Sequence, residues 1–154
     1  SPKDLKESNT FTSEYKILQI CPPDFQINKF FYKKIGKNHQ WTDRLIWKDS
    51  QWIGYVNDKK VYTYILKHND NMAGYFELIH HKNINEIEIA YLGLLEEFLN
   101  KKLGSFLLDS ALKKAFLKKP KRIWVHTCTL DHKNALKNYL ARGMKVFKEE
   151  TLSI

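Results

Sequence analysis

Cysteine, arginine and long apolar runs are all scarce in this sequence. The 154 residues include two cysteines, Cys21 and Cys128, which lie far apart and form no Cys-x-x-Cys pair. This spacing argues against a disulfide framework and fits the reducing conditions of the cytoplasm. No apolar run approaches the roughly 20 residues that a membrane-spanning helix needs, and no stretch has the pattern of a signal peptide. We therefore expect a cytoplasmic protein with no membrane partner.

Acidic residues are also in deficit. The chain has 26 Lys and Arg residues against 17 Asp and Glu, which gives a formal net charge of +9 at pH 7. Such a charge favours an anionic partner, which could be nucleic acid, a membrane surface or a phosphorylated cofactor. Only three of the basic residues are arginines, the side chains that usually read bases and phosphates specifically. This composition argues against sequence-specific nucleic-acid binding.

Apolar residues make up 43% of the chain, which is enough for a folded core. The length predicts a single domain over residues 1–154, with the polar residues 1–14 loosely held. Hydrophobic periodicity then predicts six strands and four helices. The strands are Tyr15–Ile20, Val61–His68, Met72–His81, Glu86–Leu95, Arg122–Thr127 and Met144–Glu149. Three of the helices run from Asp24 to Ile35, from Leu103 to Leu117 and from Asp131 to Gly143. The fourth is a short helix that starts at Asp49 or Ser50.

The order of these elements predicts an α/β (α+β) fold with a mixed sheet. The three strands within residues 61–95 follow one another through short turns, so they form an antiparallel meander. The strand–helix–strand unit of residues 86–128 must cross over and place its two strands in parallel. Alternation along the strand from Glu86 puts Glu88 and Ala90 on one face and Ile89 and Tyr91 on the other.

A basic turn precedes the third helix. Lys101 and Lys102 stand where that helix starts, and cations there oppose the positive end of the helix dipole. An anion bound to the free main-chain N–H groups would make the arrangement favourable. The turn therefore predicts a phosphate held by the backbone from Asn100 to Ser105, with the lysines as electrostatic support.

Two segments, together with the order of elements, resemble the GNAT family of N-acetyltransferases. The turn of residues 99–104 stands where that family has its Q/R-x-x-G-x-G/A pyrophosphate loop; Gly104 matches, whereas Leu99 and Lys102 depart from the pattern. Residues 125–147 resemble the strand–helix–strand segment of the family, with Asn134 and Tyr139 at its recurring positions. The segments 39–44, 74–78 and 124–131 resemble a bacterial subgroup with a Trp-rich N-terminal part and the motif WVHTCTLDH.

The resemblance implies the GNAT fold, with six to seven strands and helices on both faces of the sheet. It also implies acetyl-CoA as cofactor and direct transfer of the acetyl group to a primary amine of a small molecule or peptide. Tyr139 would donate a proton to the departing thiolate, and Asn134 would contact the cofactor arm. That arm would lie where the strand 89–95 separates from 122–127; Gly93 could instead be a bulge residue. The implied cofactor contacts are Gly93, Leu94, Leu95, Leu99, Asn100, Lys101, Lys102, Leu103, Gly104, Ser105, Asn134 and Tyr139.

The attacking amine needs a base, because amines are protonated near neutral pH. Glu88 and Glu77 are the candidates, and an ordinary ion-paired position on the sheet is the alternative for each. The family resemblance places the acceptor pocket beside the Trp-rich segment, where aromatic walls and one acid would suit a cation. The tryptophans could equally pack in the core, and the two charges could pair with each other. The residues assigned to this pocket are Trp41, Asp43, Arg44, Glu77 and His126.

A metal site, a lysine-rich binding surface and the oligomeric state remain to be considered. His126, Cys128 and His132 lack the converging set of ligands that a metal needs, so no metal is expected. A second hypothesis is a binding module that docks nucleic acid or an acidic partner through a lysine-rich face, for which a solvated helix end is the simpler interpretation. That face comprises Lys113, Lys114, Lys118, Lys119, Lys121 and Arg122. The sequence leaves the oligomeric state open, a homodimer included.

Overall fold

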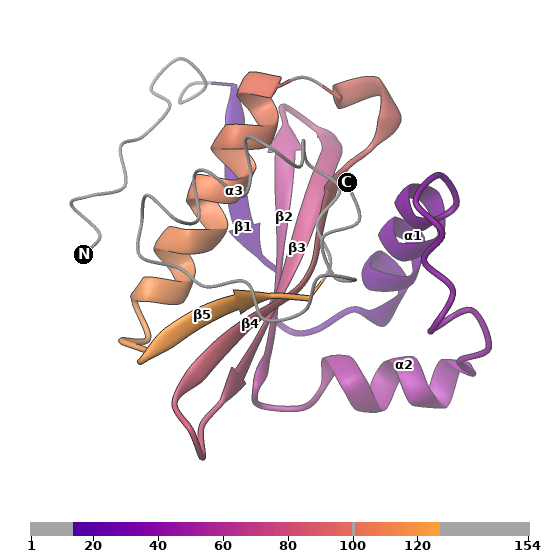
Figure 1. Cartoon of the computed structure of the whole chain (residues 1–154). Helices are drawn as coiled ribbons and strands as arrows, with labels where there is room; N and C mark the ends of the chain where they lie inside the picture. The colour runs from indigo at the N-terminus through magenta and orange to yellow at the C-terminus, as the bar shows by residue number, and fades with distance from the viewer. Residues whose placement is uncertain (1–13, 100, 127–154) are drawn as a thin grey trace.

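The computed structural model describes residues 14–99 and 101–126, which form a mixed sheet flanked by helices (Figure 1). Within these residues the sheet has five strands in the order β1-β2-β3-β4-β5. The strands are β1 (Tyr15–Gln19), β2 (Val61–His68), β3 (Asn71–His81), β4 (Glu86–Leu94) and β5 (Arg122–Val125). β1 to β4 pair antiparallel and β5 pairs parallel to β4, which confirms the predicted meander and crossover. The helix expected from Asp131 and the strand Met144–Glu149 lie outside the described residues.

The helices are α1 (Phe25–Gly36), α2 (Asp49–Val56) and α3 (Lys101–Phe116), with a short 3₁₀ turn, η3 (Glu96–Phe98), between β4 and α3. The side chain of Asp24 accepts a hydrogen bond of 3.0 Å from the N–H of Gln26, so it caps α1 as the sequence predicts. α3 begins two residues earlier than expected. Lys101 and Lys102 therefore lie inside its first turn instead of preceding it.

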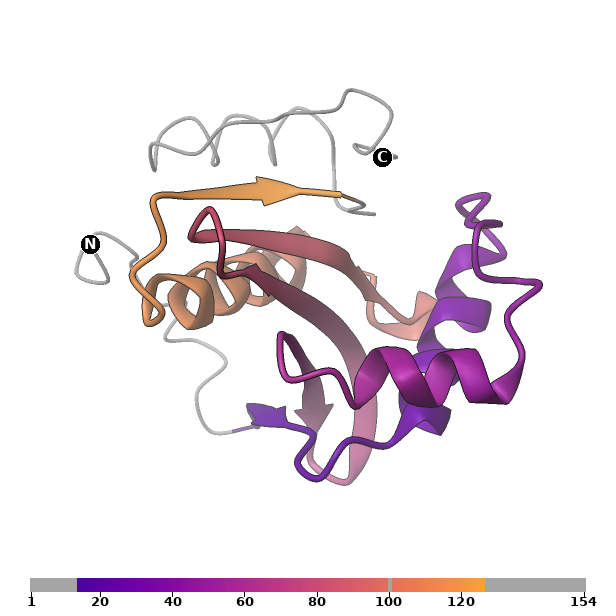
Figure 2. The same ribbon diagram turned by 90° about the horizontal axis from the view of Figure 1, so that it is seen from below.

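The two faces of the sheet have different cores. Aliphatic residues of β2 to β5 pack against α3 on one face, with Leu107, Ala111 and Leu112 fully buried. Aromatic residues dominate the other face, where Tyr32 of α1, Trp52 of α2 and Trp41 from the connection between them share a core with residues of the sheet. Figure 1 shows α3 on the opposite side of the sheet from α1 and α2, and Figure 2 shows β5 as the outermost of the described strands beside β4. Helices on both faces are therefore confirmed.

A one-residue bulge in β4 changes which way its side chains point. Glu77 of β3 pairs with Tyr91, but the next residue, Leu78, pairs with Ile89, so Ala90 has no partner across the ladder. Tyr91 consequently joins Ala90 in the aromatic core under α1 and α2, whereas Ile89 packs with α3. The prediction that Tyr91 shares a face with Ile89 is wrong, because strict alternation holds only along a regular strand. The bulge lies at Ala90, and Gly93 pairs regularly with Tyr75.

Two lysines of the basic face take part in packing. The ammonium of Lys118 lies 3.5 Å from the ring centroid of Tyr62, and that of Lys114 lies 5.6 Å from the ring of Tyr64. Both tyrosines belong to β2, so the lysines cover the sheet at the end of α3. Cation–π contacts of this kind stabilise the helix against the sheet.

Candidate active site

A buried ion pair lies at the centre of the aromatic face. Nη1 of Arg44 is 3.0 Å from Oε1 of Glu77, and the side chains are 6% and 0% exposed. Burial by itself lowers the pKa of Arg44, but the carboxylate of Glu77 and the neighbouring tyrosines together raise it by more than burial lowers it. The net shift of the pKa is upward, so the guanidinium stays charged. Five aromatic rings lie 4.3 to 5.8 Å from it: Tyr32, Trp47, Trp52, Tyr55 and Tyr91.

Two polar side chains complete the shell of Glu77. The hydroxyl of Tyr55 donates to Oε1 at 2.7 Å, and the amide of Asn28 donates to Oε2 at 2.8 Å. Burial, followed by the charge of Glu77, raises the pKa of Tyr55 well above its usual value, which keeps its hydroxyl a donor. The sequence analysis missed both residues. Asn28 could have been found, because it falls on the buried stripe of α1 at the spacing i, i+3, i+4, i+7 with Phe31, Tyr32 and Ile35.

Asp43 is exposed and lies at the outer side of this group. Its Oδ1 accepts hydrogen bonds from the hydroxyls of Tyr32, at 2.9 Å, and Tyr91, at 2.5 Å. Burial is the main reason that the pKa of Tyr32 rises to about 12, and it also raises the pKa of Tyr91. Both phenols therefore remain protonated at neutral pH and fix the carboxylate in place.

The structure excludes one alternative for the Trp-rich segment, in which its two charges pair with each other. Asp43 and Arg44 do not pair with each other; Arg44 turns inward to Glu77, and Asp43 turns to the two tyrosines. Consecutive residues outside a helix point in different directions, so each charge meets a different layer of the molecule. The tryptophans divide between core and rim, since Trp41 and Trp52 are 5% and 1% exposed and Trp47 is half-buried.

Glu88 lies on the same side of the sheet, between two histidines. Nε2 of His81 is 2.8 Å from Oε1 of Glu88, and Nδ1 of His126 is 3.5 Å from Oε2. A carboxylate only accepts hydrogen bonds, so Nε2 of His81 carries the proton in this contact. The ring of Tyr91 packs edge-on against His126 at 5.7 Å, which connects Glu88 to the aromatic group around Asp43. The sequence analysis named Glu88 and His126 but missed His81, which the antiparallel pairing of β3 and β4 brings in.

The expected cofactor contacts gather at the end of β4 and the start of α3. Gly93 and Leu94 lie in β4, the N–H of Leu95 donates to the carbonyl of Ala73 at 2.8 Å, and Leu99 is exposed. α3 starts directly afterwards with no acidic residue in its first turn, where Leu103 is buried and Ser105 is exposed. An N-terminus of this kind fits the anionic pyrophosphate of coenzyme A.

Several expected contacts lie outside the described residues. They are Asn100, Asn134 and Tyr139, together with the place where β4 was expected to separate from β5. The described ladder between these two strands runs from Glu86 and Arg122 to Ile89 and Val125. Within the described ranges, no group of three or more His, Cys, Asp and Glu residues could hold a metal ion. No helix in those ranges is long and apolar enough to span a membrane.

The same arrangement of sheet and helices occurs in solved acetyltransferases. An aminoglycoside acetyltransferase from an uncultured soil metagenomic sample has a TM-score of 0.63 and 12% sequence identity, over 92% of this chain and 94% of that one. A GNAT acetyltransferase of Staphylococcus aureus has a TM-score of 0.62 and 19% identity, over 90% and 89% of the two chains. The ribosomal-protein-S18-alanine N-acetyltransferase of Escherichia coli has a TM-score of 0.60 and 12% identity, over 84% and 76%.

At these identities the solved structures show a shared fold. No curated protein is similar enough in sequence to match the chain. The family model described as Acetyltransferase (GNAT) family matches residues 15–144, a span that includes the aromatic group, Glu88 and the start of α3. Because this match covers most of its length, the chain belongs to the GNAT family of acetyltransferases.

Proposed function

We propose that this protein is an acetyl-CoA-dependent N-acetyltransferase that acts on the primary amine of a small molecule or peptide. The observation that carries the proposal is the position of Glu88. Its carboxylate lies between His81 and His126, and Tyr91 connects this group to Asp43, since its ring contacts His126 and its hydroxyl donates to Asp43. A carboxylate in hydrogen-bond contact with imidazoles, beside a second carboxylate that can attract an ammonium group, provides what deprotonation of an amine requires.

The proposed cofactor site is the end of β4 and the first turn of α3. Main-chain N–H groups from Asn100 to Ser105 would hold the pyrophosphate, with Lys101 and Lys102 adding positive charge. The backbone of Gly93, Leu94 and Leu95 would align the pantetheine arm as an added strand. When bound, acetyl-CoA supplies the activated acetyl group as a thioester.

The chain's own residues divide the remaining work. Asp43 attracts the cationic acceptor, and the tyrosines that hold its Oδ1 keep it in one position. Glu88 accepts the proton of the amine as the new carbon–nitrogen bond forms, and the N–H of His81 donates to Oε1 of Glu88, which holds the carboxylate in position. Tyr139 donates a proton to the sulfur as the carbon–sulfur bond breaks, and Asn134 positions the cofactor arm. His126 lines the acceptor side, and the buried Trp41 supports it through Tyr91, whose ring contacts both.

Glu77 has a different role in this proposal. Its carboxylate is fully buried, and both oxygens already accept hydrogen bonds from Arg44, Tyr55 and Asn28. The side chain of Glu77 is 0% exposed and that of Glu88 is 11% exposed, so Glu88 has the surface that a substrate can reach, as a base requires. We therefore assign Glu77 and Arg44 to the framework of the acceptor pocket, and Glu88 alone to proton transfer.

The named activities of two structural neighbours support an amine as acceptor. One acts on aminoglycosides and another on the alanine of a ribosomal protein, and both kinds of molecule present amino groups. Because each neighbour is only 12% identical to this chain, neither indicates which of these two kinds of acceptor the chain uses.

The test uses a matched pair of glutamates on β4. Glu88→Gln should lower kcat by about 100-fold with unchanged affinity for acetyl-CoA, because general-base catalysis typically contributes 10²–10⁴-fold. Glu86→Gln is the control, since Glu86 is two residues away on the same strand face and pairs with Arg122 at 3.0 Å. Release of free thiol from acetyl-CoA would be measured with alanyl peptides, spermidine and kanamycin, and cofactor binding by calorimetry.

Three results bear on different parts of the proposal. Loss of activity in Glu88→Gln alone would support it. Equal activity of both variants would remove Glu88 as the base but leave the acetyltransferase assignment standing. A folded protein that binds no acetyl-CoA at millimolar concentration would sink the assignment itself.

A further inference from the structure

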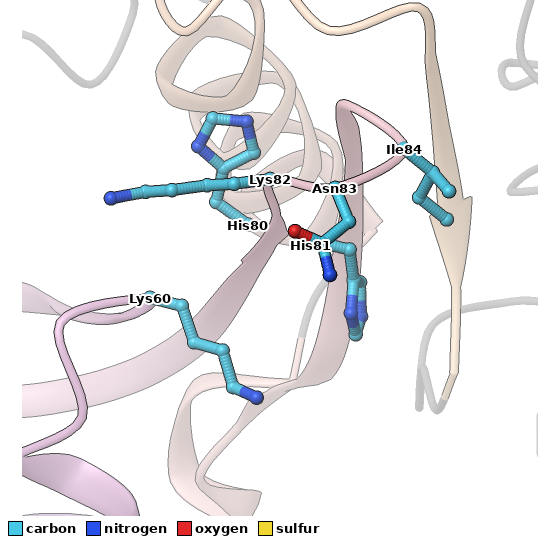
Figure 3. Close-up of a pocket in the computed structure, with 6 residues that line it drawn as sticks. All are labelled: Lys60, His80, His81, Lys82, Asn83 and Ile84. Atoms are coloured by element: carbon cyan, nitrogen blue, oxygen red, sulfur yellow. The ribbon is translucent and has the colours of Figure 1, made fainter.

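A hollow of about 390 Å³ lies beside the proposed base, between the α2–β2 connection and the β3–β4 turn. Six residues line it: Lys60, His80, His81, Lys82, Asn83 and Ile84. Figure 3 shows the side chains of His81 and Asn83 pointing to the same side of the turn as the ammonium of Lys60, whereas the ring of His80 points to the other side. The main-chain bond from His80 N–H to the carbonyl of Lys60, at 2.8 Å, holds the two walls together.

Lys60 and Lys82 give the hollow positive charge. None of the six lining residues is acidic, and within the described residues no carboxylate pairs with the ammonium of Lys60 or Lys82. The nearby acids are engaged elsewhere. Asp58 accepts from the main-chain N–H of Lys60 at 3.0 Å, and Glu86 pairs with Arg122 at 3.0 Å. The lining therefore favours an anion, with Asn83 as an additional hydrogen-bond donor.

His81 connects this hollow to the proposed reaction centre. One side of its ring faces the hollow, and its Nε2 is the atom 2.8 Å from Glu88. The ring also stacks on Trp124, with centroids 5.6 Å apart and an angle of 15° between planes, which fixes its orientation. A molecule whose amine reaches Glu88 therefore has its adjoining atoms beside this wall.

We propose that the hollow binds a carboxylate of the acceptor, so that the acceptor is an amine with an acidic group close by, such as a peptide with an acidic second residue. This inference rests on the proposed function. Lys60 and Lys82 attract the carboxylate, Asn83 donates to it, and Asp43 attracts the amine on the other side of Glu88. Polycations such as aminoglycosides are poor acceptors, because their extra ammonium groups meet the same lysines. This distinguishes the chain from its aminoglycoside-modifying structural neighbour.

The experiment compares amidated tripeptides that differ in one charge, Ala-Glu-Ala and Ala-Gln-Ala, with kanamycin as the polycation. The glutamate peptide should be acetylated with about tenfold higher kcat/KM, the ratio expected for one charge-assisted contact of about 1.4 kcal/mol. Lys60→Ala should reduce that ratio to about twofold or less, and Lys60→Glu should reverse it. Lys59→Ala is the matched control, an exposed neighbouring lysine that does not line the hollow, and should leave the ratio unchanged.

A second readout does not depend on turnover. Imidazole NMR signals of His81, followed during titration with each peptide, should shift with the glutamate peptide at several-fold lower concentration than with the glutamine peptide, and the difference should shrink at high salt. Equal affinities, equal kcat/KM values, or a charge preference that survives Lys60→Glu would overturn the inference. Acetylation of both peptides alike would do so while leaving the proposed function intact, whereas selective binding without acetylation would count against the function alone.

Discussion

Glu77 shows how one residue can connect several elements at the residue scale. Its carboxylate on β3 accepts hydrogen bonds from Asn28 on α1, Arg44 in the α1–α2 connection and Tyr55 on α2. Separating such a pair leaves a charge in a medium that solvates it poorly, so the cost exceeds the worth of the contact itself. The pair thus fixes the position of the segment that carries Asp43.

Arg44→Met should lower the free energy of unfolding by about 3–5 kcal/mol, because it leaves Glu77 buried and uncompensated. The double variant with Glu77→Leu should recover part of this loss. Lys29→Ala serves as the comparison: it breaks a pair with Asp49 whose side chains are 31% and 62% exposed, and should cost less than about 1 kcal/mol. Urea denaturation measures all three. A loss for Arg44→Met no larger than that for Lys29→Ala would contradict the importance of the buried pair.

Among the contacts between elements, the packing of β3 against β4 leaves no room for a side chain at Gly74. A Cβ atom added there would lie 2.7 Å from the carbonyl oxygen of Gly93 and 2.9 Å from Cδ2 of Leu94. The carbonyl belongs to the main chain of β4, so it cannot move aside without shifting the strand. The backbone of Gly93 and Leu94, which is proposed to align the pantetheine arm, is thereby held in place by a glycine on the neighbouring strand.

Gly74→Ala should therefore destabilise the protein by about 1–3 kcal/mol and weaken acetyl-CoA binding, because the clash displaces Gly93. Gly54→Ala should have the opposite sign. It lies in α2 with nothing within 4 Å of an added Cβ, and alanine in a helix is favoured over glycine by about 0.5–1 kcal/mol. Thermal denaturation and calorimetry with acetyl-CoA would test both. Equal stability of the two variants would show that β4 can yield at this point.

At the scale of the whole molecule, the two cores differ in chemistry. The core under α3 is largely aliphatic, whereas the core under α1 and α2 is aromatic and contains hydroxyls that must stay protonated. Burial, as the largest cause, raises the pKa of Tyr32 to about 12 and also raises that of Tyr55, Tyr75 and Tyr91. Most of these tyrosines belong to the aromatic core, although burial also raises the pKa of Tyr64 in the core under α3.

Stability should consequently fall as the pH rises above about 10. A tyrosine whose folded pKa lies above its unfolded value contributes its full stabilisation below pH 10, and loses it as the pH rises through the folded pKa, about 12 for Tyr32. Urea midpoints and tyrosinate absorbance across this range would measure the effect. Tyr32→Phe should be less stable at neutral pH, since Asp43 loses a donor, but should lose less between pH 10 and 12. Parallel pH profiles for both proteins would contradict this account.

Local patterns in the sequence predicted the order of the described helices and strands correctly. Apolar alternation, the cap at Asp24 and the turns at Asn69 and Asn85 act over a few residues, so a linear pattern contains them; both asparagines have positive φ. The resemblance to the GNAT family came from short segments of the same kind, and the family model confirms the family over residues 15–144. The residue pattern left Glu77 and Glu88 as the two candidate bases. Asn28 was visible in principle as a polar residue on a buried helical stripe.

Only the tertiary structure decided which of these residues meet. The bulge at Ala90 turned Tyr91 toward Asp43, and strand pairing brought His81 and His126 to the two oxygens of Glu88. Arg44 pairs with Glu77, which is 33 residues away in the sequence, and not with its neighbour Asp43. Burial and cross-strand distance set these partners, and both depend on contacts between segments that no local pattern of the sequence encodes.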